Sequence, residues 1–304
     1  INSVLVHLKV NTPGSINMPT LRDLRRRIKS VQGTQQITKA MEMVAAAKLR
    51  KAQTKLESSR PYATKMQSML DNLSSRTISL SHPLFEKREV KKLCLVVITS
   101  DRGLCGSYNH NVIHQAEQFL KSYDPGRVFL VIIGKKAYTY FAKRRWVIKQ
   151  KYLNLGGNLN FAQVKNISGD LTNLFLSAEA DEVHFVYTRF FSAVTHRVTI
   201  EKFLNIESQV KTESKESYVD YIFEPDPQKI FSELLPNYCM TRVQMFLAES
   251  FASEHGSRMI SMGAATKNAE EMIEHLTLVL NKLRQASITK EMLEITTGAE
   301  ALKG

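Results

Sequence analysis

The sequence predicts an α/β protein in which the two ends of the chain form a long antiparallel coiled coil and the middle forms a compact domain. Near each end, apolar residues recur in alternating steps of three and four, which is typical of a coiled-coil seam. In the middle, short apolar runs alternate with helix-like segments, which is typical of layered α/β domains.

The first end segment, about residues 20–75, has the composition of one long helix. It is rich in Ala, Lys, Arg, Gln and Met, and its only helix breakers are Gly33 and Pro61. We expect Pro61 to bend the helix without ending it. Some 55 residues of helix would run about 80 Å, which is longer than a core of this chain could bury. The predicted seam positions are Leu21, Leu24, Ile28 and Val31, followed by Ile37, Met41 and Val44.

The last end segment, from Tyr238 to Ala301, mirrors the first. It contains no Pro and only three Gly, and its apolar positions alternate in steps of four and three. Because a compact domain separates the two helices along the chain, an antiparallel pair is the simplest arrangement. We expect Gly263 to soften this helix locally, since Gly costs about 1 kcal/mol relative to Ala. The seam positions are Met262, Thr266, Ala269, Ile273, Leu276, Leu280, Leu283 and Ser287.

The middle of the chain predicts a Rossmann-like α/β domain, because apolar runs rich in β-branched residues alternate with helical segments. The expected strands are Leu93–Thr99, Val128–Ile133, Val183–Arg189 and His196–Phe203, and the expected helices are Ser107–Ser122, Lys135–Arg145 and Phe161–Ala178. The predicted division of the chain is an arm at 1–18, a first coiled-coil helix at 19–78, the central domain at 79–236 and a last coiled-coil helix at 237–304.

The charge of the chain predicts an acidic partner. The net charge is +13, and residues 19–76 alone hold 13 basic and four acidic residues, a net +9. Residues 237–304 hold seven basic and eight acidic residues, a net −1. No run of about 18 apolar residues occurs, so we expect membrane association only through a partner complex.

Three scattered cysteines indicate neither a disulfide framework nor a metal site, and they favour a reducing compartment. Because the chain begins at Ile1, we expect that an organellar transit peptide has been removed.

The sequence offers no catalytic chemistry. It has no GxxxxGK[ST] loop and no GxGxxG after a strand. The stretch Asp101–Gly106 follows a strand and opens a helix, where an anion could bind, but a tight turn is the simpler interpretation. Cys105 has no base placed near it, and His110 and His114 have no third ligand, so we expect solvent-facing histidines. We therefore expect no catalytic, cofactor or metal site.

Four blocks resemble the γ subunits of F-type ATP synthases, of mitochondrial type. Thr34–Lys48 resembles the N-terminal helix signature of that family, Ser100–Gly106 a second block and Tyr221–Leu234 a third. Residues 258–301 resemble its C-terminal signature. The blocks occur in family order over residues 20–302.

The resemblance implies a rotor. The end helices would enter the cavity of a hexamer of alternating α and β subunits, and the central domain would form a foot on the c-ring together with an ε-type subunit (δ in mitochondria). Proton flow would turn the ring and this chain, so that the β catalytic sites change state in sequence. A basic first helix suits the acidic lever segments of β known in the family. The implied location is the matrix side of the mitochondrial inner membrane, or else the cytoplasmic face of a bacterial membrane.

The resemblance also assigns contacts. Arg284 and Gln285 match a pair that hydrogen-bonds a catch loop of β, and Thr289 lies in the same network. Met41 and Arg258 match positions that face β. The matching foot residues that face the c-ring are Tyr221 and Glu224.

Each assigned contact has a simpler alternative. Met41 could pack only inside the coil, Arg284 and Gln285 could be a solvated face, and Arg258 an ordinary surface arginine. Tyr221 and Glu224 could serve only the structure of the foot. The regulatory cysteine pair of chloroplast members is missing, so no thiol switch is expected.

Two other function classes compete with the rotor. A basic coiled-coil protein that binds nucleic acid fits the charge, but the chain has no base-reading module, and its basic helix carries a seam that needs a partner helix. An α/β enzyme with coiled-coil ends lacks a nucleophile, a base and a phosphate loop. We therefore expect no nucleic-acid partner.

Overall fold

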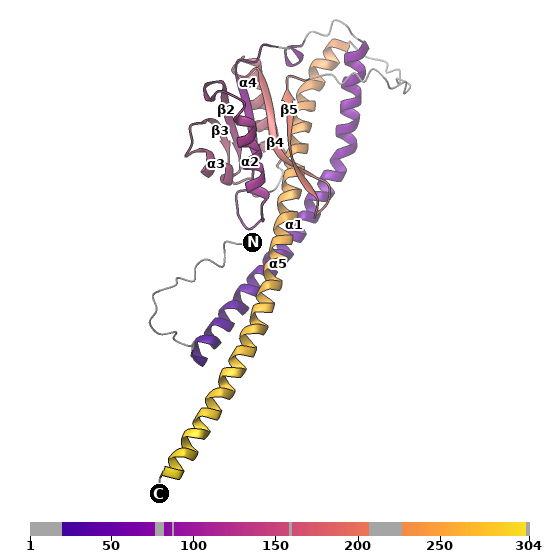
Figure 1. Ribbon diagram of the computed structural model, residues 1–304. Helices are drawn as coiled ribbons and strands as arrows, with labels where there is room; N and C mark the ends of the chain where they lie inside the picture. The colour runs from indigo at the N-terminus through magenta and orange to yellow at the C-terminus, as the bar shows by residue number, and fades with distance from the viewer. Residues whose placement is uncertain (1–19, 77–81, 87, 158–159, 207–226, 302–304) are drawn as a thin grey trace. The chain divides into compact units, whose positions relative to one another are not determined.

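The computed structural model describes residues 20–76, 82–86, 88–157, 160–206 and 227–301 (Figure 1). The predicted arm at 1–18 and the predicted foot contacts Tyr221 and Glu224 lie outside these residues. The chain divides into two compact units. We call Ile1–Thr38 with Ala265–Gly304 the terminal unit and Lys39–Ala264 the central unit, and we describe each by itself. In the described residues, no helix combines the length and apolar character required to cross a membrane.

The central unit holds a five-stranded sheet in the order β3-β2-β1-β4-β5. The strands are β1 (Leu93–Ile98), β2 (Val128–Ile133), β3 (Val147–Tyr152), β4 (Glu182–Phe190) and β5 (His196–Leu204). The first four run parallel and β5 is antiparallel to β4. Parallel neighbours need a crossover, and the helices α2 (Tyr108–Leu120), α3 (Lys135–Phe141) and α4 (Phe161–Leu176) supply it.

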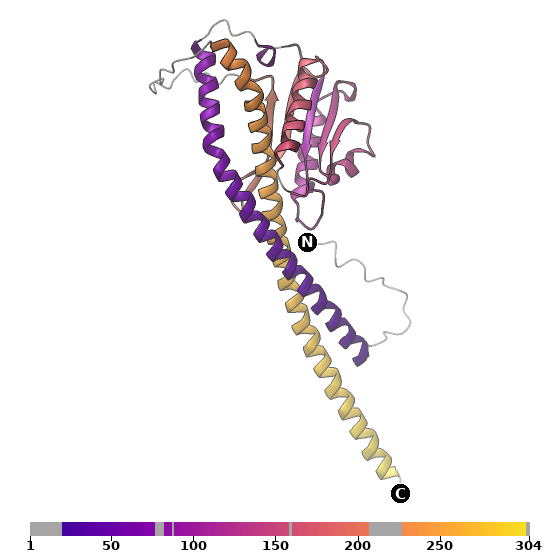
Figure 2. The ribbon, with the colours of Figure 1, turned by 180° about the vertical axis from the view of Figure 1, so that it is seen from behind.

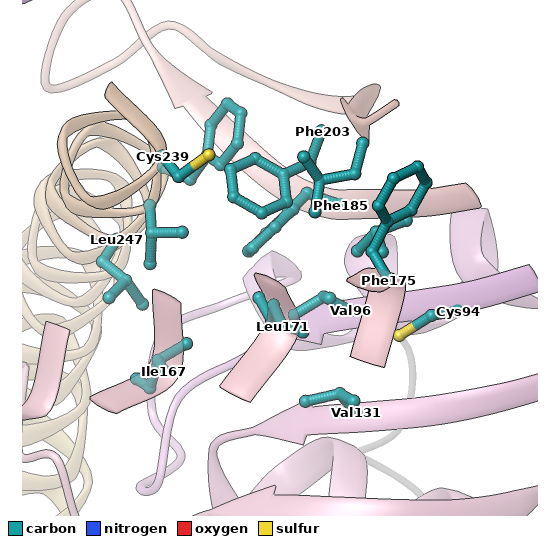
Figure 3. Packing of buried hydrophobic residues seen from close by; sticks show 14 of the residues in the cluster. Cys94, Val96, Val131, Ile167, Leu171, Phe175, Phe185, Phe203, Cys239 and Leu247 are labelled. Carbon is teal, nitrogen blue, oxygen red and sulfur yellow. The ribbon is translucent and has the colours of Figure 1, made fainter. Parts of the chain in front are cut away.

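The sheet is buried on both faces, which is why β1 and β2 are apolar throughout. On one face, alternate residues such as Leu95 and Leu130 pack with α2 and α3. On the other face, Cys94, Val96 and Val131 pack with α4 and with the long helix α5 (Pro227–Ala301), as Figure 3 shows. The predicted Rossmann-like α/β domain is therefore confirmed.

Most predicted elements of this domain lie within a few residues of the observed ones, but β3 has no counterpart among them. Its sequence, VIKQKY, has only two strongly apolar residues because β3 is an edge strand with alternating exposed and half-buried positions. Short apolar runs predict central strands and miss an edge strand of this kind.

Within the central unit, α1 (Leu21–Arg76) and α5 lie side by side and antiparallel (Figures 1 and 2). The Gln244 side chain donates to Ser59 Oγ at 3.2 Å, and Tyr238 Oη donates to Gln67 Oε1 at 2.6 Å, so rising numbers on α1 meet falling numbers on α5. The helix α1 continues through Pro61, as predicted. The last helix begins at Pro227 rather than near residue 237, and it also continues through a proline, Pro236.

The predicted seam of α5 is confirmed over its whole length. In the terminal unit it packs against α1, where Thr266 Oγ1 donates to Thr38 Oγ1 at 2.9 Å and where Leu24 is buried. All eight positions are buried or half-buried: Met262, Thr266, Ala269, Ile273, Leu276, Leu280, Leu283 and Ser287.

The seam of α1 is confirmed at Leu21, Leu24, Ile28 and Val31 and is wrong at Ile37 and Val44, while Met41 is half-buried. Ile37 is 63% exposed and Val44 is 56% exposed. The true seam continues the alternating steps of four and three through small or polar residues, which hydropathy alone does not mark. Its inward positions are Gln35 and Thr38 in the terminal unit, and Glu42, Ala45 and Leu49 in the central unit.

Two glycines of α5 differ in the room available for an added Cβ atom, and this difference gives a stability prediction. A Cβ on Gly263 would meet the Glu42 carboxylate at an ordinary 3.5 Å, whereas one on Gly256 would lie 3.1 Å from the Ala193 carbonyl oxygen. We expect Gly263→Ala to raise the free energy of unfolding by about 0.5–1 kcal/mol through helix propensity. Gly256→Ala, the matched control, should lower it because the β4–β5 turn would have to move. Urea denaturation measures both changes, and a destabilised Gly263→Ala variant would contradict this account.

Candidate functional site

Three of the predicted contact residues lie together on the exposed surface of α5 in the terminal unit. Arg284, Gln285 and Thr289 are exposed, while the neighbouring seam residues Leu283 and Ser287 are half-buried. Thr289 Oγ1 donates to the backbone carbonyl oxygen of Gln285 at 3.0 Å, so this bond does not involve the Gln285 side chain. Within the described residues, the Arg284 guanidinium forms no ion pair. The helix therefore presents a cation and an amide to solvent at adjacent positions.

The same stretch of α5 exposes an unusual number of large apolar side chains. On a helix with 3.6 residues per turn they spread over about 220° of its circumference, outside the seam. A helix with apolar residues on nearly all sides is normally buried. We call these six residues the exposed apolar set: Met272, Leu278, Ile288, Met292, Leu293 and Ile295.

Arg258, a further predicted contact residue, is engaged inside the central unit. Its side chain is 11% exposed, and its Nη1 lies 2.7 Å from Oε1 of Glu254, which is 7% exposed. Nε and Nη2 also donate to the Gly103 carbonyl oxygen at 3.3 Å. Burial raises the pKa of Glu254, against the opposing effect of the Arg258 charge. In the structure, Arg258 therefore anchors the turn at residues 102–103 to α5. The predicted contact of Arg258 with a partner subunit remains a prediction.

His255, beside this ion pair, is held neutral. Arg258 Nη1 lies 3.4 Å from His255 Nδ1, and because a guanidinium only donates, Nδ1 must accept. The proton then sits on Nε2, which lies 3.4 Å from the Gly157 carbonyl oxygen. Burial, together with the Arg258 charge, lowers the pKa of His255 to about 4. A positive charge at this position would be unpaired and buried.

A pH prediction follows from His255. Its folded pKa of about 4 lies below the ordinary 6.5, so the unfolded chain takes up a proton first as the pH falls. Folding stability is therefore lost as the pH falls through 6.5 toward 4, by about 2 kcal/mol between pH 7 and pH 5. His255→Gln should lack this loss when the free energy of unfolding is measured at both pH values. His110→Gln, an exposed control, should keep it, and identical pH profiles for wild type and His255→Gln would contradict the assignment.

Asp101 has a structural role that the sequence did not reveal. Its Oδ1 accepts from the backbone nitrogens of Lys135 and Asn154 at 3.1 and 3.0 Å, and its Oδ2 accepts from Gly156 at 3.2 Å. The carboxylate thereby satisfies N–H groups beyond the carboxyl ends of the strands, where an external anion would otherwise be favoured. This supports the tight-turn interpretation of Asp101–Gly106. Its position three residues after the end of β1 was the one available signal.

The remaining candidates for chemistry are structural. All three cysteines are buried and free. Burial raises the pKa of the Cys105 thiol, and it raises the pKa of the Cys239 thiol to about 12. His110 and His114 are exposed and stacked, as expected. In the part of the chain that the structure describes, no group of three His, Cys, Asp or Glu side chains could hold a metal ion.

Met41 is half-buried in the central unit, next to an ion pair between Lys39 Nζ and Glu42 Oε2 at 3.2 Å. Its neighbours Met43 and Val44 are exposed. Partial burial fits packing within the coil and leaves part of the side chain accessible, so the predicted contact of Met41 with a partner remains a prediction.

Comparison with known proteins identifies the family. The family model described as ATP synthase matches residues 20–302. The ATP synthase gamma chain of Protochlamydia amoebophila is 49% identical over 94% of this chain and its own full length. That of Desulforamulus reducens is 46% identical over the same shares.

Solved structures agree. A chain from the central stalk and c-ring structure of the Tetrahymena thermophila mitochondrial ATP synthase has a TM-score of 0.58 and 26% identity, over 75% of this chain and 99% of its own. A chain of the Euglena gracilis mitochondrial ATP synthase, 19% identical over 93% of this chain and 94% of its own, shares the fold with a TM-score of 0.63. The chain therefore belongs to the ATP synthase gamma chain family.

Proposed function

We propose that this chain is the central-stalk rotor subunit of an ATP synthase and couples rotation of a c-ring to ATP synthesis and hydrolysis at the sites of another subunit. The exposed apolar set carries this proposal. Six large apolar side chains around a helix whose seam is already paired are costly in water, and a close-fitting protein sleeve would remove that cost. The partners are the α and β subunits of the hexamer, a δ/ε-type stalk subunit and the c-ring.

The chain itself is proposed to be non-catalytic. Its thiols are buried with raised pKa values, and the His255–Glu254–Arg258 cluster is engaged in holding a turn. Polar groups that are all satisfied by one another are poor candidates for acid–base chemistry. ATP turnover would then occur in the hexamer.

The proposed division of labour along the chain follows the expected segments. Residues 19–78 and 237–304 would form the shaft, and residues 79–236 the foot. Met41, Arg258, Arg284, Gln285 and Thr289 would face the hexamer, and Tyr221 and Glu224 the c-ring. The alternative of a nucleic-acid-binding protein loses its basis, because the seam of the basic helix is already occupied by α5.

We propose that the chain is peripheral to the membrane and held there by the complex. Two locations fit this role. The solved structures that it resembles come from mitochondria, while its curated relatives come from bacteria. The proposed location is therefore the matrix side of the mitochondrial inner membrane or the cytoplasmic face of a bacterial membrane.

The experiment that tests this function is purification of the native complex through a tag on this chain, followed by native mass spectrometry. We expect one copy of the chain with three α and three β subunits. Recovery of the chain only as a free monomer, or only bound to nucleic acid, would contradict the proposal.

A further inference from the structure

The edge of the sheet at β3 is unpaired. Among the described strands β3 pairs only with β2, so its outer edge presents backbone N–H and C=O groups that no other described strand satisfies (Figure 1). Such an edge is a template for another strand. Proteins that recognise extended peptides commonly use an edge of this kind beside a groove that takes the peptide's side chains.

A groove of about 370 Å³ runs beside this edge, between α3 and β3. Tyr138, Ala142, Trp146 and Ile148 supply its apolar and aromatic lining. The register of β3 shifts by one residue opposite Leu130 and Val131, which allows Ile148 and Lys151, three positions apart, both to line the groove. The groove therefore combines an apolar floor with a strand edge.

The same region carries a dense positive charge. Between Lys135 and Lys151 there are seven basic residues and no acidic one, and all seven are exposed. Arg144 and Lys149 pair with Glu117 and Glu179. The other five have no ion pair within the described residues: Lys135, Lys136, Lys143, Arg145 and Lys151.

Two of these unpaired cations lie over the walls of the groove. Lys151 Nζ donates to Tyr138 Oη at 3.3 Å and lies 4.6 Å from the centre of that ring. The Arg145 guanidinium lies 5.6 Å from the centre of the Trp146 ring. An occupant with acidic side chains on either side of an apolar one would match this arrangement.

We propose that the β3 edge binds an extended, acidic segment of a partner protein, which adds to the sheet as a sixth strand and places one apolar side chain in the groove. A second copy of this chain does not fit, because its lysines would lie against the same lysines, and like charges disfavour the wrong partner. An anionic membrane would use the charge but neither the strand edge nor the groove. The site lies on residues 135–151, outside the residues proposed to form the shaft, and binding there goes beyond the rotor function.

The test uses the full chain and a fluorescent probe, the octapeptide Glu-Val-Glu-Leu-Glu-Val-Glu-Val, in anisotropy titrations. Arg145→Glu with Lys151→Glu should weaken binding at least tenfold. The control is Lys121→Glu with Lys165→Glu, which makes the same charge change at two other exposed sites, one just after α2 and one on α4. It should change binding less than twofold. Ala142→Phe, which fills the groove from an exposed position, should also weaken binding at least tenfold.

Two N-methylated versions of the peptide separate strand addition from plain charge attraction. N-methyl groups on one alternate set of residues should abolish binding to the wild-type chain, whereas the other set should preserve it, because only one set faces β3. This comparison uses only the wild-type chain, so its result does not depend on whether a protein variant folds.

Equal binding of the two N-methylated peptides, equal weakening by the Lys121/Lys165 control, or no binding of the probe would each overturn the proposal. So would binding of phosphatidylglycerol vesicles that depends on Arg145 and Lys151 while the peptide does not bind, since the surface would then recognise a membrane.

Discussion

Replacing Arg258 with alanine should lower the free energy of unfolding by about 3–5 kcal/mol, the range typical of removing one partner of a buried ion pair. Glu254, which is 7% exposed, would lose its 2.7 Å bond, and the Gly103 carbonyl oxygen would lose its guanidinium donor. The turn between β1 and α2 would then be released from α5. Urea denaturation monitored by circular dichroism measures the loss.

Two further variants make this result specific. Arg284→Ala removes an exposed arginine of the same helix and should change stability by less than about 0.5 kcal/mol. Arg258→Ala combined with Glu254→Gln should recover part of the loss, because no unpaired charge remains buried.

The cost of Arg258→Ala should also depend on pH. Burial raises the pKa of Glu254, and removal of the cation raises it further, so the variant favours the protonated carboxyl. A group with a raised folded pKa stabilises at low pH and loses that contribution as the pH rises through it. The deficit should therefore be larger at pH 8 than at pH 5. An equal, small deficit at both values would show that the pair does not hold the turn.

The second large effect concerns function rather than stability. We expect Arg284→Ala with Gln285→Ala to leave the unfolding free energy of the chain within about 0.5 kcal/mol of wild type, because both side chains are exposed. In the assembled complex the same variant should lower ATP hydrolysis about tenfold. That factor corresponds to ~1.4 kcal/mol, a modest value for a charge-assisted contact with a carboxylate.

The control for this variant is Lys282→Ala with Lys290→Ala. These lysines are exposed on the same stretch of α5, so their removal tests whether general positive charge matters. Steady-state hydrolysis by purified complexes of equal subunit content is the measurement. Unchanged turnover in the Arg284/Gln285 variant, or an equal loss in the lysine control, would refute the proposed contact of Arg284 and Gln285 with the hexamer.

The local sequence pattern predicted the type and the buried side of an element where these depend only on the residues of that element. The short apolar runs of β1 and β2, rich in β-branched residues, predicted buried strands, and the steps of four and three in α5 marked its buried side as far as Ser287. The same reasoning failed on α1, where Ile37 and Val44 are apolar but face outward. These apolar side chains are exposed, and hydropathy alone does not distinguish a buried seam position from an exposed apolar one.

The candidate site shows a second limit. Arg284, Gln285 and Thr289 were predicted from resemblance, and the structure places them together on one exposed stretch because spacing on a single helix is fixed by its geometry. The role of Arg258 could not be predicted in this way. Its i,i+4 partner Glu254 is visible in the sequence, but Gly103 lies 155 positions away and is brought near only by the packing of a turn on α5.

The most direct test of the central claim, that this chain turns inside a ring of other proteins, is observation of single molecules. Lys165 is exposed on α4, and the three native thiols are buried, so Lys165→Cys offers a selective point for attaching a gold rod. With the hexamer fixed to a surface, ATP should drive stepwise rotation of the rod in one direction. Sustained ATP hydrolysis by the same complexes with a stationary rod would contradict the account.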